Sequence, residues 1–335
     1  MMMEKGKKEI PNIFNYATSE LTQDAFICWL CEWSRSKFKE KNKALHNTGC
    51  NLIKSMLNKN SVLLKNNLEA LKIKRQAEGV IDVIIELNNH VILIEDKVDS
   101  KEHSDQLERY KEKIVKKKPK KQIVPIYFQT GIQSNYNIVD EAGYKIFSRI
   151  DFLRVLNDGL DLGIKNDVYQ SFHGYLKRMD KRFNSFENKK IEAWDWEGWQ
   201  GFFSLLQKQL DDANWGYVAN QSGGFMGFWW NFHPVDDCTI YMQLENDKLC
   251  YKISIDNEGS NYSKLRNYWN KKIIEVSQSI DLDIHKPKRF GYGEHMTVAV
   301  LGGDYRVSNS NKLLDQDKTI EKLKKAERVL NKVIN

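Results

Sequence analysis

The sequence predicts an α/β fold for its first half and an α+β fold with an antiparallel sheet for its second half. In the first half, a helical pattern, three strands, another helix and a further strand follow one another. In the second half, short aromatic-rich strands alternate with turn residues and are followed by helical patterns. A chain of 335 residues also exceeds the usual size of one hydrophobic core, which predicts two domains.

The first half begins with two expected helices. Residues 18–36 start with hydroxyl and acidic residues suited to a helix start, and large apolar residues then recur at helical spacing. A second helix is expected over residues 51–60 or somewhat more. Residues 104–118 are charged and helix-prone, which predicts a third helix after the strands described next.

Two β-branched runs, residues 80–87 and 90–96, are joined by Asn88 and Asn89, which is typical of a β-hairpin. A strand near residues 71–76 would complete a three-stranded meander. Residues 122–129 predict another strand, although Pro125 favours an edge or irregular position for it.

One or two helices are expected between residues 149 and 184, and the composition changes abruptly soon afterwards. We therefore predict domains at 1–186 and 187–335. Within the second domain, the expected strands are residues 215–221, 225–232, 239–245, 249–255 and 295–301, and the expected helices are residues 261–280 and 315–333.

The composition, 41% hydrophobic and 29% charged, is that of a folded globular protein. No apolar stretch is long enough to span a bilayer and no secretory signal can be recognised, so we expect a cytoplasmic protein. The five cysteines lack metal-ligand spacing, which favours reduced, buried thiols over a zinc site. A net charge of +7 is consistent with a polyanionic partner such as nucleic acid.

The hairpin concentrates the residues that carry chemistry. Asp82 lies among apolar strand residues, where an unpaired carboxylate is costly. A two-residue loop at 88–89 pairs residue 82 with residue 95, and alternation places Lys97 on the same face as Glu95, with Asp96 on the other. Asp82, Glu95 and Lys97 are therefore expected to converge.

Carboxylates of this kind suit Mg²⁺ or Mn²⁺, which prefer oxygen ligands. The expected metal ligands are Asp82 and Glu95, with water and the backbone carbonyl of Asp96 completing the shell. An ammonium beside the metal, here Lys97, can lower the pKa of an attacking water and offset negative charge growing on a phosphate. The combination predicts phosphodiester hydrolysis.

These residues resemble the PD-(D/E)XK nuclease superfamily, in which a carboxylate on one strand precedes E-x-K on the next. A following helix carries Q-x-x-x-Y in many members, and Gln106 and Tyr110 match it here. Residues 18–30 resemble the opening segment of a bacterial branch, in which Glu20 holds an acidic position. One departure is Ile81, which stands where the proline of the motif name would be; that proline is variable in such families.

The resemblance, which covers residues 12–129, implies a restriction-endonuclease-like core with a mixed central sheet flanked by helices. It also implies a metal-dependent nuclease, with DNA as the expected substrate. Gln106 and Tyr110 would orient Lys97 or a substrate phosphate. The alternatives are a catalytically inactive nucleic-acid-binding or regulatory protein of the same fold, and a nuclease acting on RNA.

Each assignment has a structural alternative. Asp82, Glu95 and Lys97 could be a cross-strand ion pair, Gln106 and Tyr110 helix-surface residues, and Glu20 part of a helix cap. These alternatives carry no catalytic role.

The lysines in and just after the second half of the third expected helix could contact a phosphate backbone, or they could complement the helix dipole in solvent. They are Lys111, Lys113, Lys116, Lys117, Lys118, Lys120 and Lys121.

The second domain is rich in tryptophan, which could stack on bases, although core packing is the more frequent role. Strand alternation sends Phe228 and Trp230 to one face of the expected sheet and Trp229 to the other. We expect the Trp229 face to be an interaction surface, for a second copy of the chain or for a protein partner.

Overall fold

The computed structural model describes residues 11–64, 72–77, 81–98, 100, 105–220, 223–235, 237–255 and 261–335. The chain divides into two compact units, Met1–Asp180 and Lys181–Asn335. The expected boundary at 186/187 stays a prediction, since it rests on composition alone. Each unit is described by itself.

In the first unit, five strands of the described chain form a mixed sheet in the order β1-β2-β3-β4-β5. The first three strands are antiparallel, whereas β3, β4 and β5 run parallel. The strands are β1 (Lys72–Ala77), β2 (Ile81–Glu86), β3 (His90–Lys97), β4 (Gln122–Gln129) and β5 (Lys145–Ser148). The predicted mixed sheet and its antiparallel meander are confirmed.

The β2–β3 hairpin has the predicted register. Val83 is paired with Ile94 and Glu86 with Val91, and the amide of Leu87 donates to the carbonyl of His90 at 2.9 Å. The loop therefore consists of residues 88 and 89, and residue 82 falls opposite residue 95.

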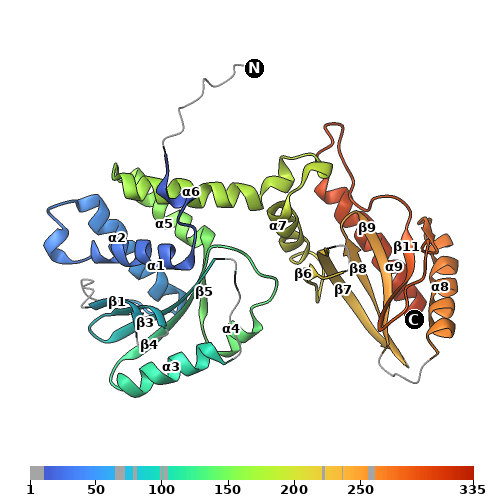
Figure 1. Cartoon of the computed structure of the whole chain (residues 1–335), viewed down its shortest axis with the longest axis horizontal. Coiled ribbons are helices and arrows are strands. Elements are labelled where there is room, and N and C mark those ends of the chain that lie inside the picture. Colours follow the sequence, from blue (N-terminus) through green and yellow to red (C-terminus); the bar gives the residue numbers. More distant parts are fainter. Residues whose placement is uncertain are drawn as a thin grey trace. The chain divides into compact units, whose positions relative to one another are not determined.

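Helices cover both faces of this sheet (Figure 1). The face covered by α1 (Glu20–Glu32), α2 (Lys43–Lys59) and α5 (Arg149–Asp161) is called the α1 face. The other, called the α3 face, is covered by α3 (Gln106–Lys117) and α4 (Asn137–Glu141).

Aromatic rings fill the core of the α1 face. Phe128 of β4 contacts Phe152 of α5 with ring centroids 4.9 Å apart. Phe26 of α1 stacks at 3.8 Å on Phe172 of α6 (Asp167–Phe183). Gly49 allows α2 to approach α1 closely, because a Cβ there would lie 2.4 Å from the Leu30 carbonyl oxygen.

Several elements of the first unit differ from the prediction. Helix α2 begins at Lys43, eight residues earlier than residue 51, because the Asn42 side chain caps it by accepting from the Leu45 amide at 3.0 Å. Strand β4 is not an edge strand, since β3 and β5 flank it. Pro125 is tolerated there because pairing with β5 starts only at Ile126. Helix α4 and strand β5 were not predicted.

In the second unit, the described strands form an antiparallel sheet in the order β10-β11-β9-β8-β7-β6. The strands are β6 (Asn214–Val218), β7 (Phe225–Val235), β8 (Cys238–Glu245), β9 (Lys248–Ile255), β10 (Ile284–His285) and β11 (His295–Leu301). The helices are α7 (Trp196–Leu206), α8 (Tyr262–Gln278) and α9 (Gln316–Ile334). The predicted α+β class is confirmed, and α7 and β10 were not predicted. The residues that the structure describes also include four short 3-10 helices. Two lie in the first unit, η1 (Ile13–Asn15) and η2 (Ser36–Phe38), and two in the second, η3 (Ser185–Glu187) and η4 (Ile191–Ala193).

The aromatic side chains of strand β7 lie on the two faces of the sheet as predicted. Trp230 is fully buried and donates from Nε1 to Glu327 of α9 at 2.7 Å, and Phe228 packs against Phe203 of α7. Trp229 is half-buried on the opposite face, where its ring lies against Gly216 and Gly227, which are paired across β6 and β7. A tryptophan over a glycine pair supplies the side-chain packing that the glycines lack.

The other tryptophans of the second unit divide between core and surface. Trp194 and Trp215 are buried, whereas Trp196 is 44% exposed. All five cysteines are free thiols, and three of them are fully buried. Among the helices of the described residues, none is both long and apolar enough to cross a membrane.

Candidate active site

The site lies on the α3 face at the carboxyl end of β3, where Glu95 and Lys97 project from the same side of the strand. The Nζ of Lys97 donates to Glu95 Oε1 at 2.7 Å, and both side chains are buried, with exposed fractions of 9% and 1%. The other carboxylate oxygen, Oε2, is buried without a hydrogen-bond partner in the described part of the chain. The glutamate therefore keeps one oxygen for a further ligand.

Asp82 reaches the same place from β2. Its Oδ2 accepts from the backbone amide of Asp96 at 2.8 Å, which fixes the carboxylate against the end of β3. The structure thus brings Asp82, Glu95 and Lys97 together, as the hairpin register predicts.

The charges of this cluster do not balance. Burial, followed by the charge of Asp82, raises the pKa of Glu95 to about 7, although Lys97 opposes the shift. Burial also raises the pKa of Asp82 above its ordinary value, despite the Asp96 amide and Lys97. For Lys97, burial lowers the pKa, but the carboxylates of Glu95, Glu20 and Asp82 together raise it by more, so the amine is protonated at neutral pH. The site has excess negative charge that a cation would relieve.

Glu20 approaches the site from the first turn of α1. Its Oε1 accepts from the backbone amide of Val98 at 3.3 Å and from the Ser100 hydroxyl. Ser19, the N-cap residue of α1, makes no side-chain capping bond. Glu20 therefore contacts the chain just beyond β3, close enough for its charge to raise the pKa of Asp82.

Gln106 and Tyr110 occupy the first turns of α3. Gln106 Nε2 donates to Glu95 Oε1 at 2.8 Å, so it contacts the glutamate rather than Lys97. Tyr110 is 9% exposed and packs in the core between α3 and the sheet. Burial and the charge of Glu95 raise the pKa of its hydroxyl. Both residues therefore lie on the face of α3 that is turned to the sheet, and the catalytic role expected for them stays a prediction.

A sequence profile of the PD-(D/E)XK nuclease superfamily matches residues 11–194, more than half of the chain. The chain belongs to the PD-(D/E)XK nuclease superfamily. No curated protein and no solved structure matches it significantly. The match runs from before α1 to η4 and includes every site residue described above.

The structure of this PD-(D/E)XK protein adds residues that the sequence did not single out. Gln23 of α1 donates from Nε2 to Asp96 Oδ1 at 2.5 Å on the α1 face, behind Glu95 and Lys97. Asp24 is fully buried nearby, within reach of the Asp96 carboxyl group, and its carboxylate oxygens have no other partner in the described residues. Burial and then the charge of Asp82 raise its pKa to about 7. The sequence feature that could have identified Gln23 and Asp24 is their position among the apolar residues of α1. Gln23 precedes Ile27 by one helical turn, so the two share a helix face.

PD-(D/E)XK nucleases generally depend on divalent metal ions. Within the described ranges, no group of three or more His, Cys, Asp or Glu side chains is arranged to hold a metal. Two carboxylates do fit such an ion, because Glu95 Oε2 is buried without a partner and Asp82 lies beside it. Mg²⁺ usually keeps several waters and takes only one or two carboxylates from the protein. Asp96 directs its own carboxylate to Gln23, so only its backbone carbonyl is available on this edge.

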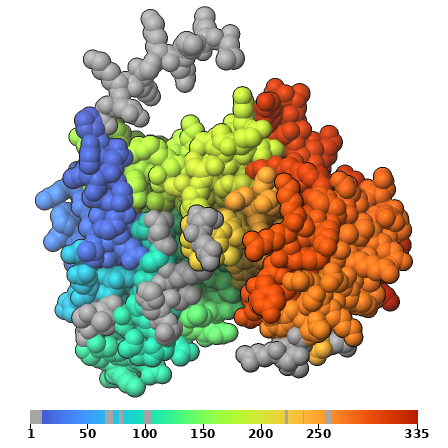
Figure 2. Space-filling view, turned by 45° about the vertical axis from the view of Figure 1, so that its right-hand side comes forward, coloured from blue at the N-terminus to red at the C-terminus, as the bar shows by residue number. Residues whose placement is uncertain are grey.

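The lysines that end α3 lie on the surface, in the teal segment of Figure 2. Lys118 and Lys121 form ion pairs with Glu86 at 3.0 and 3.5 Å, and Lys111 donates to the Ala142 carbonyl at 2.9 Å. The helix extends about 16 Å from Gln106 to its last residue, at 1.5 Å per residue. Lys116, Lys117 and Lys118 therefore lie far from Glu95. Lys118 and Lys121 bind the sheet through Glu86, and Lys111 binds the end of α4.

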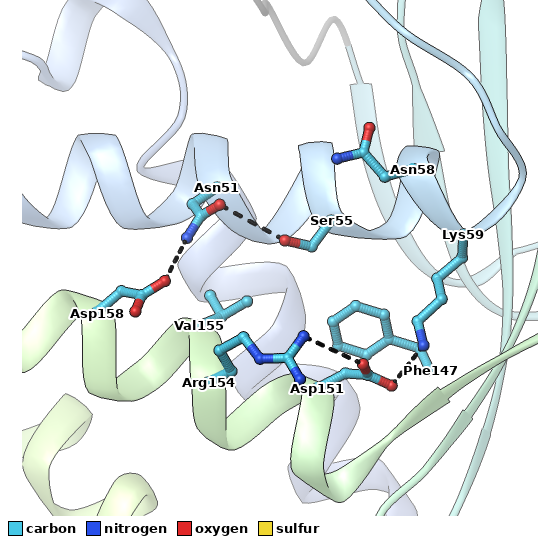
Figure 3. A pocket seen from close by; sticks show the side chains of 9 residues that line it. All are labelled: Asn51, Ser55, Asn58, Lys59, Phe147, Asp151, Arg154, Val155 and Asp158. Atoms are coloured by element: carbon cyan, nitrogen blue, oxygen red, sulfur yellow. Dashed lines mark hydrogen bonds and ion pairs between the residues drawn. The ribbon is translucent and has the colours of Figure 1, made fainter.

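A separate cavity of about 330 Å³ lies between α2 and α5 (Figure 3). Phe147 of β5 contributes to its lining and shares the α1 face with Phe128 and Asp96, so the cavity is across the sheet from Glu95. Its cations are matched by anions: Asp151 lies 2.8 Å from Lys59 and 4.0 Å from Arg154. The cavity thus lacks the excess charge that distinguishes the Glu95 site.

Proposed function

We propose that this protein is a metal-dependent nuclease that hydrolyses phosphodiester bonds, with DNA as its substrate. The proposal rests on the close approach of Asp82, Glu95 and Lys97 in the interior of the protein. In this cluster, Glu95 Oε2 has no hydrogen-bond partner in the described residues. Buried carboxylates with raised pKa values are costly unless a cation or a proton compensates them. A catalytic metal explains why the fold maintains them.

In this proposal Asp82 and Glu95 hold Mg²⁺ or Mn²⁺, with the backbone carbonyl of Asp96 as a further oxygen donor. The bound cation would supply Lewis acidity toward water and phosphate. Gln106 fixes the Glu95 carboxylate by donating to Oε1, so that Oε2 is left for the metal.

Lys97 acts as a positive charge, because its raised pKa keeps the amine protonated. An ammonium can donate a hydrogen bond to the attacking water and to a phosphate oxygen, but it cannot accept the proton of that water. Its contribution is greatest when negative charge grows on the phosphate in the transition state. Glu20 contributes negative charge at the edge where Asp82 lies, and Tyr110 supports α3 behind Gln106.

Two alternatives concern the substrate and the activity. RNA carries the same phosphodiester chemistry, so the site residues support either nucleic acid, and the choice of DNA follows the family resemblance. A binding or regulatory protein without catalysis would not need an intact pair of carboxylates with a buried lysine. The presence of all three favours catalysis.

The test is cleavage of plasmid DNA, single-stranded DNA and RNA by the full chain, with Mg²⁺, with Mn²⁺ and with EDTA. We expect metal-dependent cleavage of at least one DNA substrate and none with EDTA. Cleavage of RNA alone would identify RNA, and not DNA, as the substrate. Binding without cleavage under every condition would favour the regulatory alternative.

A further inference from the structure

A buried hydrogen-bonded chain lies behind the site, on the α1 face of the sheet. Thr130, which follows β4, donates from Oγ1 to Gln23 Oε1 at 2.7 Å, and Gln23 Nε2 donates to Asp96 Oδ1 at 2.5 Å. All three side chains are buried, with exposed fractions of at most 3%. The amide of Gln23 therefore has a preferred orientation, because reversing it would place its oxygen against the carboxylate oxygen of Asp96.

Backbone hydrogen bonds connect these three side chains to the site. The amide of Asp96 donates to Asp82 Oδ2 at 2.8 Å, and the side chains on either side of Asp96 are Glu95 and Lys97. The amide of Thr130 also donates to the Lys97 carbonyl at 3.1 Å. Any movement of Asp96 would thus shift one metal-binding carboxylate directly and the other through its hydrogen bond.

We infer that Gln23 is a positioning residue for the metal site, which it controls by holding the Asp96 side chain on the opposite face of β3. The inference rests on the proposed function for its effect on metal binding. Its structural part, the hold of Gln23 on Asp96, is independent of that function. Partners that orient metal ligands typically contribute about 10- to 100-fold to metal affinity or activity.

Two charge-neutral changes test this role in the full chain. Gln23→Met keeps the approximate volume but removes both hydrogen bonds of the amide. Gln23→Glu combined with Asp96→Asn exchanges the amide and the carboxylate, which restores a donor–acceptor pair at the same place and still lets Thr130 donate to residue 23.

The control is Gln243→Met in the second unit. Gln243 is 6% exposed and donates to Glu245 at 2.9 Å, so it is also a buried glutamine bonded to a carboxylate. A general effect of losing such a bond would appear equally in this variant.

Two readouts are needed, hydrogen exchange of the Asp96 amide and calorimetric titration with Mn²⁺. We expect Gln23→Met to lower the protection of the Asp96 amide about tenfold and to weaken Mn²⁺ binding about 10- to 100-fold. The exchanged pair should recover both values to within about threefold, and Gln243→Met should alter neither.

Unchanged Asp96 protection in Gln23→Met would overturn the inference, as would an exchanged pair that behaves like Gln23→Met. If the unmodified protein binds no Mn²⁺ and cleaves no nucleic acid, the proposed function fails. In that case the amide exchange still decides whether Gln23 holds Asp96.

Discussion

Each unit of the molecule contains a glutamate that accepts from one lysine and one glutamine. In the first unit Glu95 accepts from Lys97 at 2.7 Å and from Gln106 at 2.8 Å. In the second unit Glu245 accepts from Lys252 at 3.0 Å and from Gln243 at 2.9 Å. The two groups have the same chemical composition.

Their surroundings differ in burial and in charge. Glu95 is 1% exposed, faces Asp82, and has an unpartnered oxygen, whereas the Glu245 side chain keeps 23% exposure beside its lysine. An ion pair that keeps part of its surface in solvent contributes little and does not need a further ligand. The comparison teaches that buried excess negative charge, and not the Glu–Lys–Gln set, marks the candidate metal site.

The largest expected effect is on the cleavage rate, which should depend on Glu95 and not on Glu245. Glu95→Gln and Asp82→Asn each preserve side-chain shape but remove a charge that the metal requires, so cleavage should fall below detection. Glu245→Gln should cleave nucleic acid at the rate of the unmodified protein. The measurement is initial cleavage rate at saturating Mg²⁺, with circular dichroism to verify folding. Equal rates for Glu95→Gln and Glu245→Gln would remove the distinction between the two groups.

The two lysines provide the next comparison. Lys97→Met should reduce turnover about 100- to 1,000-fold, as removal of one transition-state charge partner does in other enzymes. Affinity for DNA, measured in Ca²⁺, should change by less than about threefold, since the interaction is made mainly in the transition state. Lys252→Met should change neither quantity. If Lys97→Met lowers the affinity for DNA without lowering turnover, Lys97 only contacts a phosphate and has no role in the transition state.

Asp24 offers a test through pH. Its folded-state pKa of about 7 lies above the ordinary 3.8, so between these values the folded protein retains a proton that the unfolded chain has lost. Stability attributable to Asp24 therefore falls as pH rises through this window, and the loss is complete above about pH 7.

Asp24→Asn removes this titration. In EDTA, its free energy of unfolding relative to the unmodified protein should increase by roughly 2 kcal/mol from pH 5 to pH 7. Asp161→Asn, at an exposed position at the end of α5, is the control and should give no such trend. Denaturant unfolding at several pH values measures it, and a flat difference for Asp24→Asn would show that burial does not perturb this carboxyl.

The smallest effect is expected at the lysines that end α3. Each phosphate contact contributes about 0.7 to 0.9 to the slope of log affinity against log salt. Because Lys118 pairs with Glu86 and Lys116 with Glu112, replacing Lys116, Lys117 and Lys118 with Gln should change the slope by less than the value of one contact. A loss of two or more contacts would assign these lysines to nucleic-acid binding.

Local patterns were sufficient to predict much of the fold and the centre of the site. The two-residue loop and strand alternation specify which residues oppose one another, so the positions of Asp82, Glu95 and Lys97 follow from a short stretch of sequence. Helix α3 begins near its expected start, which places Gln106 at the site. Strand β5 was missed because its four residues give too short a pattern to recognise.

The rest of the site depends on contacts between distant segments. Gln23 lies 73 positions before Asp96 and 107 before Thr130, so no local pattern indicates their hydrogen bonds. Gln106 was expected beside Lys97 or phosphate, and its contact with Glu95 depends on how α3 packs on the sheet. The polar residues on the apolar stripe of α1 show only that some buried partner is required.

Titration with Mn²⁺ in a calorimeter tests the central claim most directly, because it requires neither substrate nor turnover. The unmodified protein and Glu245→Gln should bind Mn²⁺ with equal affinity and stoichiometry, and Asp82→Asn and Glu95→Gln should each lose that binding. If all four proteins bind Mn²⁺ alike, or if none binds it, the buried excess charge beside Glu95 is not a metal site.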